Sequence, residues 1–286
     1  MSKIRYSELF YSIQSEGRYT GTPSVFLRMF GCNFKCKNFN RHGDDLLPVT
    51  LKHNPEVMNV IKNIDNYEKL EDLPLVHTGC DSYPSVYPEF KRFSKDKTID
   101  QVVDGILELL PHKIWVDEHL VITGGEPLLG WQRVYPELLG HRHMGSLKEL
   151  TFETNGTQPL TDEFKEYLKL WGDRDHITFS VSAKLSNSGE SREDAIKPNV
   201  VVDYQSVGFT YLKFVISNED DLKEVLKTTT IYRDHGFTGP VYVMPCGGTT
   251  ESFNLTYKEV ADLALKNGLR YSDRLHIRLY GNEWST

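Results

Sequence analysis

The stretch "LVITGGEPLL" at residues 120–129 joins an apolar run to a turn that contains two glycines. An apolar run over 119–124 predicts a buried strand, and it leads directly into Thr123-Gly124-Gly125-Glu126-Pro127. Two glycines at the end of a strand let the backbone approach a ligand closely, and proline fixes the turn. In open α/β sheets and barrels, ligands bind at the carboxyl ends of strands. Taken alone, however, paired glycines favour an ordinary strand-to-helix turn.

Strand patterns and helix patterns alternate along the chain. Short apolar runs predict strands, and apolar residues at helical spacing after a capping threonine predict helices. The predicted strands are 24–31, 119–124, 147–154, 176–183, 210–216, 240–245 and 274–281, and the predicted helices are 98–110, about 131–140, 161–171, 218–236 and 256–268. This alternation predicts an α/β fold with a mainly parallel sheet, either a partial (βα) barrel or an open doubly wound sheet.

Residues 37–97 interrupt the alternation. They are polar, charged and rich in Asn, Asp, Lys and Pro, with a helical pattern only in stretches such as "NPEVMNVIKNI" (54–64). We interpret the segment as a long insertion at the edge of the sheet. The alternative is a solvated surface excursion.

Composition excludes several classes of function. The 286 residues include 33 basic and 40 acidic side chains, a net charge of −7, which does not indicate a nucleic-acid-binding surface. No apolar run reaches the ~18–20 residues of a membrane span, and the N-terminus lacks the apolar stretch of a secretory signal. We therefore expect a cytoplasmic protein with a small-molecule substrate. In a reducing compartment its four cysteines are core thiols or metal ligands.

The stretch "GCNFKCKNFN" (31–40) spaces Cys32 and Cys36 as the first two ligands of a cluster might be spaced. Phe39 stands where a third cysteine would be expected. Either this is not a cluster site, or the third ligand is Cys80 or Cys246.

Together with the glycine turn, this spacing resembles the radical S-adenosylmethionine (SAM) enzymes. In that family three cysteines hold a [4Fe–4S] cluster, and SAM binds the iron that the protein leaves open. SAM is then cleaved to a 5′-deoxyadenosyl radical. The resemblance implies a partial (βα) barrel of the radical SAM type, and it implies that the turn residues Gly124, Gly125 and Glu126 bind SAM.

The triplet Cys80-Asp81-Ser82 resembles one branch of the family, 7-carboxy-7-deazaguanine synthase. There the last cluster cysteine is followed by Asp and by a hydroxyl residue that binds Mg²⁺. The resemblance implies that Cys32, Cys36 and Cys80 hold the cluster and that Ser82 binds Mg²⁺. Residues 37–79 become an insertion within the cluster motif of a single domain, 1–286. Lengthening that loop costs roughly 2.5–3 kcal/mol.

The N-terminal stretch "LFYSIQSEGRYTGTPSVFLRMFGCN" (9–33) also resembles this branch. It implies that Gln14, Glu16, Gly17 and Arg28 hold a pterin substrate. An amide and a carboxylate match the donor-rich ring edge, and a guanidinium matches the substrate carboxylate. Ser15 departs from the usual glycine, which leaves the local backbone geometry open. Thr123 and His276 are further candidates for substrate contact.

Later strand ends resemble the SAM-contacting segments of the family. "FETNGT" (152–157) and "SVSAKLSNSGE" (180–190) place polar residues after strands. The resemblance implies SAM contacts for Glu153, Asn155, Ser182 and Lys184, although Ala183 replaces the usual proline. We expect Cys246 to be a non-ligand thiol.

The implied reaction converts 6-carboxy-5,6,7,8-tetrahydropterin to 7-carboxy-7-deazaguanine with loss of ammonia, as in queuosine and other 7-deazapurine biosynthesis. Its implied cofactors are the [4Fe–4S] cluster, SAM and Mg²⁺. An electron donor such as flavodoxin or ferredoxin and a homodimer are also implied, with no membrane and no direct nucleic-acid partner. Two alternatives stay open: a radical SAM enzyme that activates a glycyl-radical protein, and a non-catalytic zinc or cluster protein.

Overall fold

A single sheet of nine strands organises the chain in the computed structural model, which describes residues 2–41, 43–48 and 50–286. The sheet order is β3-β1-β2-β4-β5-β6-β7-β8-β9. Strand β1 is antiparallel to β2 and β3, and every pair from β2 to β9 is parallel. The strands are β1 (Lys3–Ile13), β2 (Pro23–Met29), β3 (Lys95–Thr98), β4 (His119–Gly124), β5 (Glu149–Thr154), β6 (Ile177–Val181), β7 (Phe209–Ile216), β8 (Val241–Pro245) and β9 (Arg270–Tyr271).

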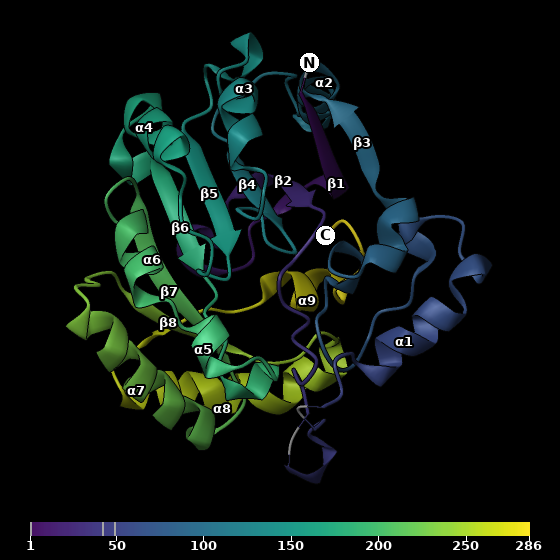
Figure 1. The fold of residues 1–286 in the computed structure, drawn as a ribbon, viewed down its shortest axis with the longest axis vertical. Coiled ribbons are helices and arrows are strands. Elements are labelled where there is room, and N and C mark those ends of the chain that lie inside the picture. Colours follow the sequence, from purple (N-terminus) through teal and green to yellow (C-terminus); the bar gives the residue numbers. More distant parts are fainter. Residues whose placement is uncertain (1, 42, 49) are drawn as a thin grey trace.

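The sheet curves without closing, and most helices lie along its outer side (Figure 1). This is the partial (βα) barrel with a mainly parallel sheet that the alternation predicts. The helices are α1 (Pro55–Lys62), α2 (Ile99–Leu109), α3 (Tyr135–Leu139), α4 (Asp162–Trp171), α5 (Arg192–Ala195), α6 (Pro198–Tyr204), α7 (Glu219–Asp234), α8 (Thr250–Lys266) and α9 (Leu275–Tyr280).

Local capping chemistry starts the helices where the sequence predicts. The Thr98 hydroxyl accepts the Gln101 N–H at 3.4 Å, and the Gln101 side chain accepts the Thr98 N–H at 3.1 Å. This reciprocal capping box begins α2. The Thr161 hydroxyl caps α4 in the same way, by accepting the Phe164 N–H at 3.3 Å.

The register of the central strands brings together side chains from distant parts of the sequence. Leu120, Val121 and Ile122 of β4 are fully buried, as expected for a parallel strand covered on both faces. In the pairing of β2 with β4, Arg28 lies opposite Thr123 and Met29 lies opposite Gly124. The chain after β2, which carries the first cysteines, therefore leaves the sheet beside the glycine turn.

The prediction of a closing strand over 274–281 is wrong, because this segment forms helix α9. A strand would place Leu275, Ile277 and Leu279 on one face, but Ile277 is buried while Leu279 is 51% exposed. The closing strand is the short β9, which ends at Tyr271. The helix stops at Gly281, whose φ of +66° is the usual left-handed helix terminator.

One helix begins at a different residue from the one predicted, and several short elements were not predicted. Helix α8 begins at Thr250, six residues before the predicted 256, because the Thr249 hydroxyl caps it. Edge strand β3 and the short helices α5 and α6 lie in segments that have no clear periodicity. Their positions depend on contacts with the rest of the fold rather than on local pattern.

The insertion between Cys36 and Cys80 forms α1 and, together with residues 83–93 after Cys80, a separate apolar cluster. Val57, Val60, Leu70, Tyr83 and Phe90 are buried in that cluster, and Trp284 from the C-terminal segment packs against it. Figure 1 shows α1 at the periphery, on the side of β1 and β3. Residues 42 and 49 of the insertion lie outside the described residues. Among the helices that the structure describes, none has the length and apolarity to cross a membrane.

Candidate active site

The three cysteines assigned to the cluster lie together on one wall of a cavity. Cys36 is buried among Phe34 and Ala195, and Cys32 and Cys80 pack against the same group. Burial raises the pKa of Cys32 to about 12 and that of Cys80 to about 11, and it outweighs the opposing effect of the Lys184 charge on both thiols. The thiols are therefore neutral until a cation or cluster compensates their charge. Thiolates are the donor set that iron–sulfur clusters use, so these residues fit that group.

No three His, Cys, Asp or Glu side chains within the described ranges converge on a single metal ion. At the Mg²⁺ position, the Ser82 hydroxyl donates to Asp81 Oδ1 at 3.2 Å and lies 3.9 Å from Cys80 Sγ. Protein side chains alone do not complete a magnesium site there.

The glycine turn contacts the cysteine segment directly. A Cβ on Gly124, whose φ is +138°, would lie 2.2 Å from the Met29 carbonyl oxygen. A Cβ on Gly125 would lie 2.3 Å from the Gly31 carbonyl oxygen and 2.8 Å from Cys32 Cβ. Such distances exclude any side chain. Both glycines line the cavity, as predicted, because only glycine permits this approach.

Glu126 of the same motif does not line the cavity. Its side chain is fully buried and accepts hydrogen bonds from the Asn155 N–H at 2.7 Å, the Leu128 N–H at 3.0 Å and the Thr154 hydroxyl at 2.8 Å. Burial raises the pKa of this carboxyl to about 7. Its side chain therefore joins the turn after β4 to the end of β5.

The predicted SAM contacts from β5 and β6 line the cavity beside the thiols. Asn155 Nδ2 donates to Asn33 Oδ1 at 2.9 Å, which links it to the residue after Cys32. Lys184 Nζ donates to the Ser182 hydroxyl at 2.9 Å. The charge of Lys184 opposes the rise in pKa of Cys36, so this cation lies close enough to stabilise the thiolate form.

The predicted substrate contacts line the other part of the cavity. Glu153, predicted as a SAM contact, accepts from Gln14 Nε2 at 3.2 Å and from the Thr123 hydroxyl at 2.9 Å, so it links two of the predicted substrate contacts. Arg28 pairs through Nε with Glu8 at 2.7 Å.

His276 reaches the substrate side of the cavity even though its segment is helical. Its Nδ1 lies 2.5 Å from the Ser15 hydroxyl, and burial lowers the pKa of His276 to about 4. The imidazole is therefore neutral near pH 7. Ser15 has no positive φ, so the serine that replaces glycine there causes no backbone strain.

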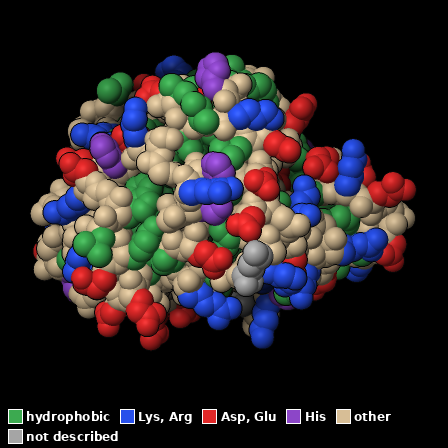
Figure 2. Space-filling model, turned by 90° about the horizontal axis from the view of Figure 1, so that it is seen from above, with side chains coloured by type: hydrophobic (Ala, Val, Ile, Leu, Met, Phe, Trp, Pro, Cys, Tyr) green, Lys and Arg blue, Asp and Glu red, His purple; other side chains and the backbone are tan. Residues whose placement is uncertain are grey.

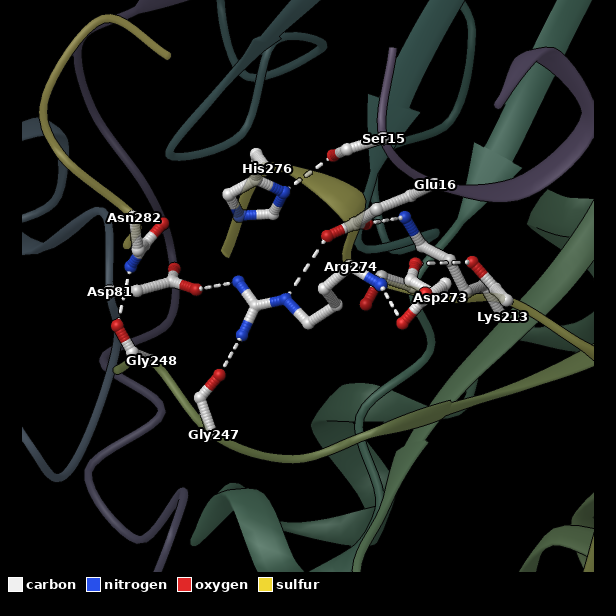
Figure 3. A network of polar contacts seen from close by, with 12 residues as sticks. Ser15, Glu16, Asp81, Lys213, Gly247, Gly248, Asp273, Arg274, His276 and Asn282 are labelled. Carbon is white, nitrogen blue, oxygen red and sulfur yellow. Dashed lines mark hydrogen bonds and ion pairs between the residues drawn. The ribbon is translucent and has the colours of Figure 1, made fainter. Parts of the chain in front are cut away.

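Glu16 lies at the centre of an ion-pair network (Figure 3). It is bound by Lys213 Nζ and by Arg274 Nε, the latter at 3.3 Å. Burial opposes its ionisation, but the two cations outweigh burial and lower the pKa of Glu16 to about 2. Arg274 also binds Asp81 and the Gly247 carbonyl oxygen, so it joins the substrate side to the segment after Cys80.

Gly17 does not line the cavity. Its N–H donates to the Ser272 hydroxyl at 2.8 Å, and a Cβ there would lie 2.1 Å from the Tyr211 hydroxyl oxygen. The residue fixes the path of the chain beside Glu16 and does not face the cavity itself.

Fifteen of the predicted residues line this one cavity. They are Gln14, Glu16, Arg28, Cys32, Cys36, Cys80, Ser82, Thr123, Gly124, Gly125, Glu153, Asn155, Ser182, Lys184 and His276. Cys246 also lines it but is not part of the apolar group that contains the other thiols.

Glu8, Lys213 and Arg274 also line the cavity and were not predicted, and Asp81 was predicted only as part of the triplet with Cys80 and Ser82, with no role of its own. A signal existed for Lys213, a lone charge inside the apolar strand "TYLKFVI". Arg274 was hidden by the incorrect strand assignment of its segment.

Curated relatives match the chain over nearly its whole length. The 7-carboxy-7-deazaguanine synthase of Pyrobaculum aerophilum is 29% identical over 283 residues, covering 98% of this chain and 96% of the relative. That of Halobacterium salinarum is 29% identical over 300 residues, covering 96% and 90%. The chain is a homologue of the 7-carboxy-7-deazaguanine synthases. The resemblance to this branch of the radical SAM enzymes is therefore confirmed.

A solved structure supports the same fold. The crystal structure of QueE from Escherichia coli superposes with a TM-score of 0.52 at 17% identity, covering 95% of this chain and 93% of that one. A short match to the synthase of Bacteroides thetaiotaomicron is 61% identical over 36 residues, 13% of this chain and 19% of the relative. No protein-family model matches the chain.

Proposed function

We propose that this protein is a 7-carboxy-7-deazaguanine synthase, a lyase that converts 6-carboxy-5,6,7,8-tetrahydropterin to 7-carboxy-7-deazaguanine with loss of ammonia. One observation carries the proposal: Cys32, Cys36 and Cys80 share a single cavity with Gln14 and Glu16. The similarity to relatives of that name supports it. A protein that only stored a cluster would not need the polar wall opposite the thiols.

The three thiols would hold a [4Fe–4S] cluster, with Gly124, Gly125, Glu153, Asn155, Ser182 and Lys184 around SAM and Ser82 beside Mg²⁺. When bound, the cluster and SAM would supply the radical that starts the ring contraction. The turn would meet SAM through its backbone, because the Glu126 carboxylate is engaged in the core.

The chain's own residues would bind and orient the pterin. Glu16 is ionised at neutral pH, so its carboxylate can accept N–H groups from the ring edge. Gln14 adds an amide, and Arg28 and Arg274 add positive charge for the substrate carboxylate. Neutral His276 can donate or accept one hydrogen bond without adding charge.

The wider proposal treats residues 1–286 as one domain with an insertion at 37–79. It includes a homodimer, a cytoplasmic location, and flavodoxin or ferredoxin as electron donor, with no nucleic-acid partner. The unpaired state of the cysteines agrees with a reducing compartment. Basic and acidic side chains are interspersed on the face in Figure 2, which agrees with a small-molecule substrate.

Cysteine variants test the cluster assignment. After anaerobic reconstitution, Cys80→Ala should lose the visible absorption of the [4Fe–4S] cluster, because one iron loses its ligand. Cys246→Ala is the matched control and should keep it. An intact cluster in the Cys80 variant would contradict the split motif.

Ser82→Ala tests the magnesium assignment. The variant should lose most of the Mg²⁺ dependence of turnover and still cleave SAM, because all three cysteine thiols remain in place. Unchanged metal dependence would count against Ser82.

Two alternatives predict different behaviour. A glycyl-radical-activating enzyme would cleave SAM without a response to the carboxytetrahydropterin. A zinc protein would reconstitute with zinc and would not bind SAM.

A further inference from the structure

The insertion that separates Cys36 from Cys80 folds back and joins the two ends of its own loop. The Gly79 N–H donates to the Phe39 carbonyl oxygen at 2.8 Å, and Asn40 Nδ2 donates to the His77 carbonyl oxygen at 2.8 Å. The chain just after Cys36 therefore runs beside the chain just before Cys80. These contacts hold the two ends of the long loop close together, so Cys36 and Cys80 are joined near the site as they would be by a short loop.

Asn54 at the start of α1 lies between these two segments. It is fully buried. Its Nδ2 donates to the Lys37 carbonyl oxygen and to the Thr78 hydroxyl, both at 3.1 Å. One amide group thus bridges the residue after Cys36 and the residue two before Cys80.

The other half of the Asn54 side chain caps α1. Its Oδ1 accepts the Glu56 N–H at 2.8 Å and the Val57 N–H at 3.4 Å. The bridge is therefore fixed to a helix whose apolar residues Val57 and Val60 are buried in the core of the insertion. The close approach also requires Gly79, because a Cβ there would lie 2.6 Å from Asn54 Nδ2.

Glu56 reinforces the same junction from the first turn of α1. Its carboxylate accepts the His77 N–H at 2.8 Å, the Thr78 N–H at 3.0 Å and the Thr78 hydroxyl at 3.0 Å. Charge-assisted hydrogen bonds of this kind are stronger than neutral ones. The start of α1 thus holds residues 77–79 through two adjacent side chains.

We infer that Asn54 and Glu56 are positioning residues which hold Cys80 in register with Cys36, so that the insertion preorganises the cluster site. This inference rests on the proposed function. Loop closure across the insertion costs entropy that would otherwise oppose binding of the third thiolate. The contacts of α1 compensate for this loss of entropy when the chain folds, before the cluster binds.

Asn54→Ser tests the bridge without removing the cap. Serine is a good N-cap residue, but its hydroxyl cannot reproduce the two donors of the amide. Asn63→Ser is the matched control, because Asn63 is exposed at the other end of α1 and its side-chain amide donates to the Asn59 carbonyl oxygen at 2.8 Å, within the same helix. After reconstitution, Asn54→Ser should lose iron to a chelator at least about fivefold faster than wild type or the control, as expected for two lost hydrogen bonds.

A second measurement does not depend on the cluster. In the apo protein, a short bismaleimide should link Cys36 to Cys80, as quantified by peptide mass spectrometry. The yield should fall in Asn54→Ser and in Glu56→Gln, and far-UV circular dichroism should show that the control and these variants remain folded.

Wild-type cross-linking yield together with wild-type iron retention in Asn54→Ser would overturn the inference. If Asn54→Ser does not fold, Glu56→Gln decides by the same two measurements. A wild-type protein that cross-links but takes up no cluster would refute the proposed function and leave the positioning of Cys80 supported.

Discussion

Lys213 and Arg274 hold Glu16, the side chain that we propose meets the pterin ring edge, in its ionised form. Lys213 is 3% exposed, so its ammonium group is shielded from water and pairs with the Glu16 carboxylate. A buried ion pair of this kind adds little stability overall but becomes costly when one partner is removed. The pair therefore serves to present an ionised Glu16 at the cavity.

Lys213→Met should lower the free energy of unfolding by about 3 kcal/mol, because Glu16 then stays buried with Arg274 alone. Urea denaturation measures the effect. Adding Glu16→Gln to the Lys213 variant should recover part of the loss. Strict additivity of the two substitutions would show that the pair is not coupled.

His276 should make folding stability sensitive to mild acid. The unfolded chain binds a proton at this residue below pH 6.5, whereas the folded chain binds it only below about 4. Between these values the unfolded state holds more protons, so stability falls as the pH falls. The contribution at pH 4.5 is about 2 kcal/mol relative to pH 7.

Urea denaturation at pH 7 and pH 4.5 tests this contribution. His276→Gln should show a smaller loss of stability in acid than wild type, whereas the exposed His112→Gln should behave as wild type. An identical acid loss in wild type and His276→Gln would contradict a buried neutral imidazole.

Most of the residues predicted for the site line the cavity, because the motifs that carry the family resemblance lie at strand ends and beside the cysteines. These motifs did not assign the direction of each side chain. Glu126 stands in the most informative motif, yet it points into the core, where three donors hold it. That outcome depends on the packing of β4 against β5, which no local pattern encodes.

Among the elements, strongly periodic helices and buried strands were predicted nearly to their ends. The segment 274–281 was not, because alternating Leu275, Ile277 and Leu279 favour a strand by pattern alone. Long-range contacts of Arg274 with Glu16 and Asp81 fix this segment across the cavity instead. Gly281 was the one local signal that indicated a helix end.

The loop before β2 and strand β7 touch at a point that tolerates no side chain. Gly17→Ala should destabilise the fold by about 2–3 kcal/mol, because its φ of +67° is left-handed and the new Cβ would meet the Tyr211 hydroxyl. Thermal unfolding measures the loss.

Tyr211→Phe provides the matched background for this change. Removing the hydroxyl relieves the shortest overlap but leaves the ring Cζ 2.8 Å from the new Cβ and leaves the backbone strain, so the Gly17→Ala loss should shrink by about 1 kcal/mol. An equal loss in both backgrounds would show that Tyr211 does not limit the position of the loop.

The whole molecule consists of a partial barrel, which the sequence predicts, and an insertion whose structure the sequence does not predict. The alternation of strands and helices indicates the barrel, since each unit buries its own apolar face. The insertion has weak periodicity because its core is small and joins residues far apart, such as Leu70 and Phe90. Its contacts with the cysteine segments are visible only in three dimensions.

Turnover of the pterin is the decisive measurement of the proposed activity. Reconstituted protein with SAM, Mg²⁺, a reductant and 6-carboxy-5,6,7,8-tetrahydropterin should form 7-carboxy-7-deazaguanine, detected by mass spectrometry. Formation of 5′-deoxyadenosine should rise when the pterin is added, and Glu16→Gln should lower product formation while the cluster spectrum is unchanged. A loaded cluster that cleaves SAM at the same rate with and without the pterin, and yields no deazaguanine product, would contradict the account.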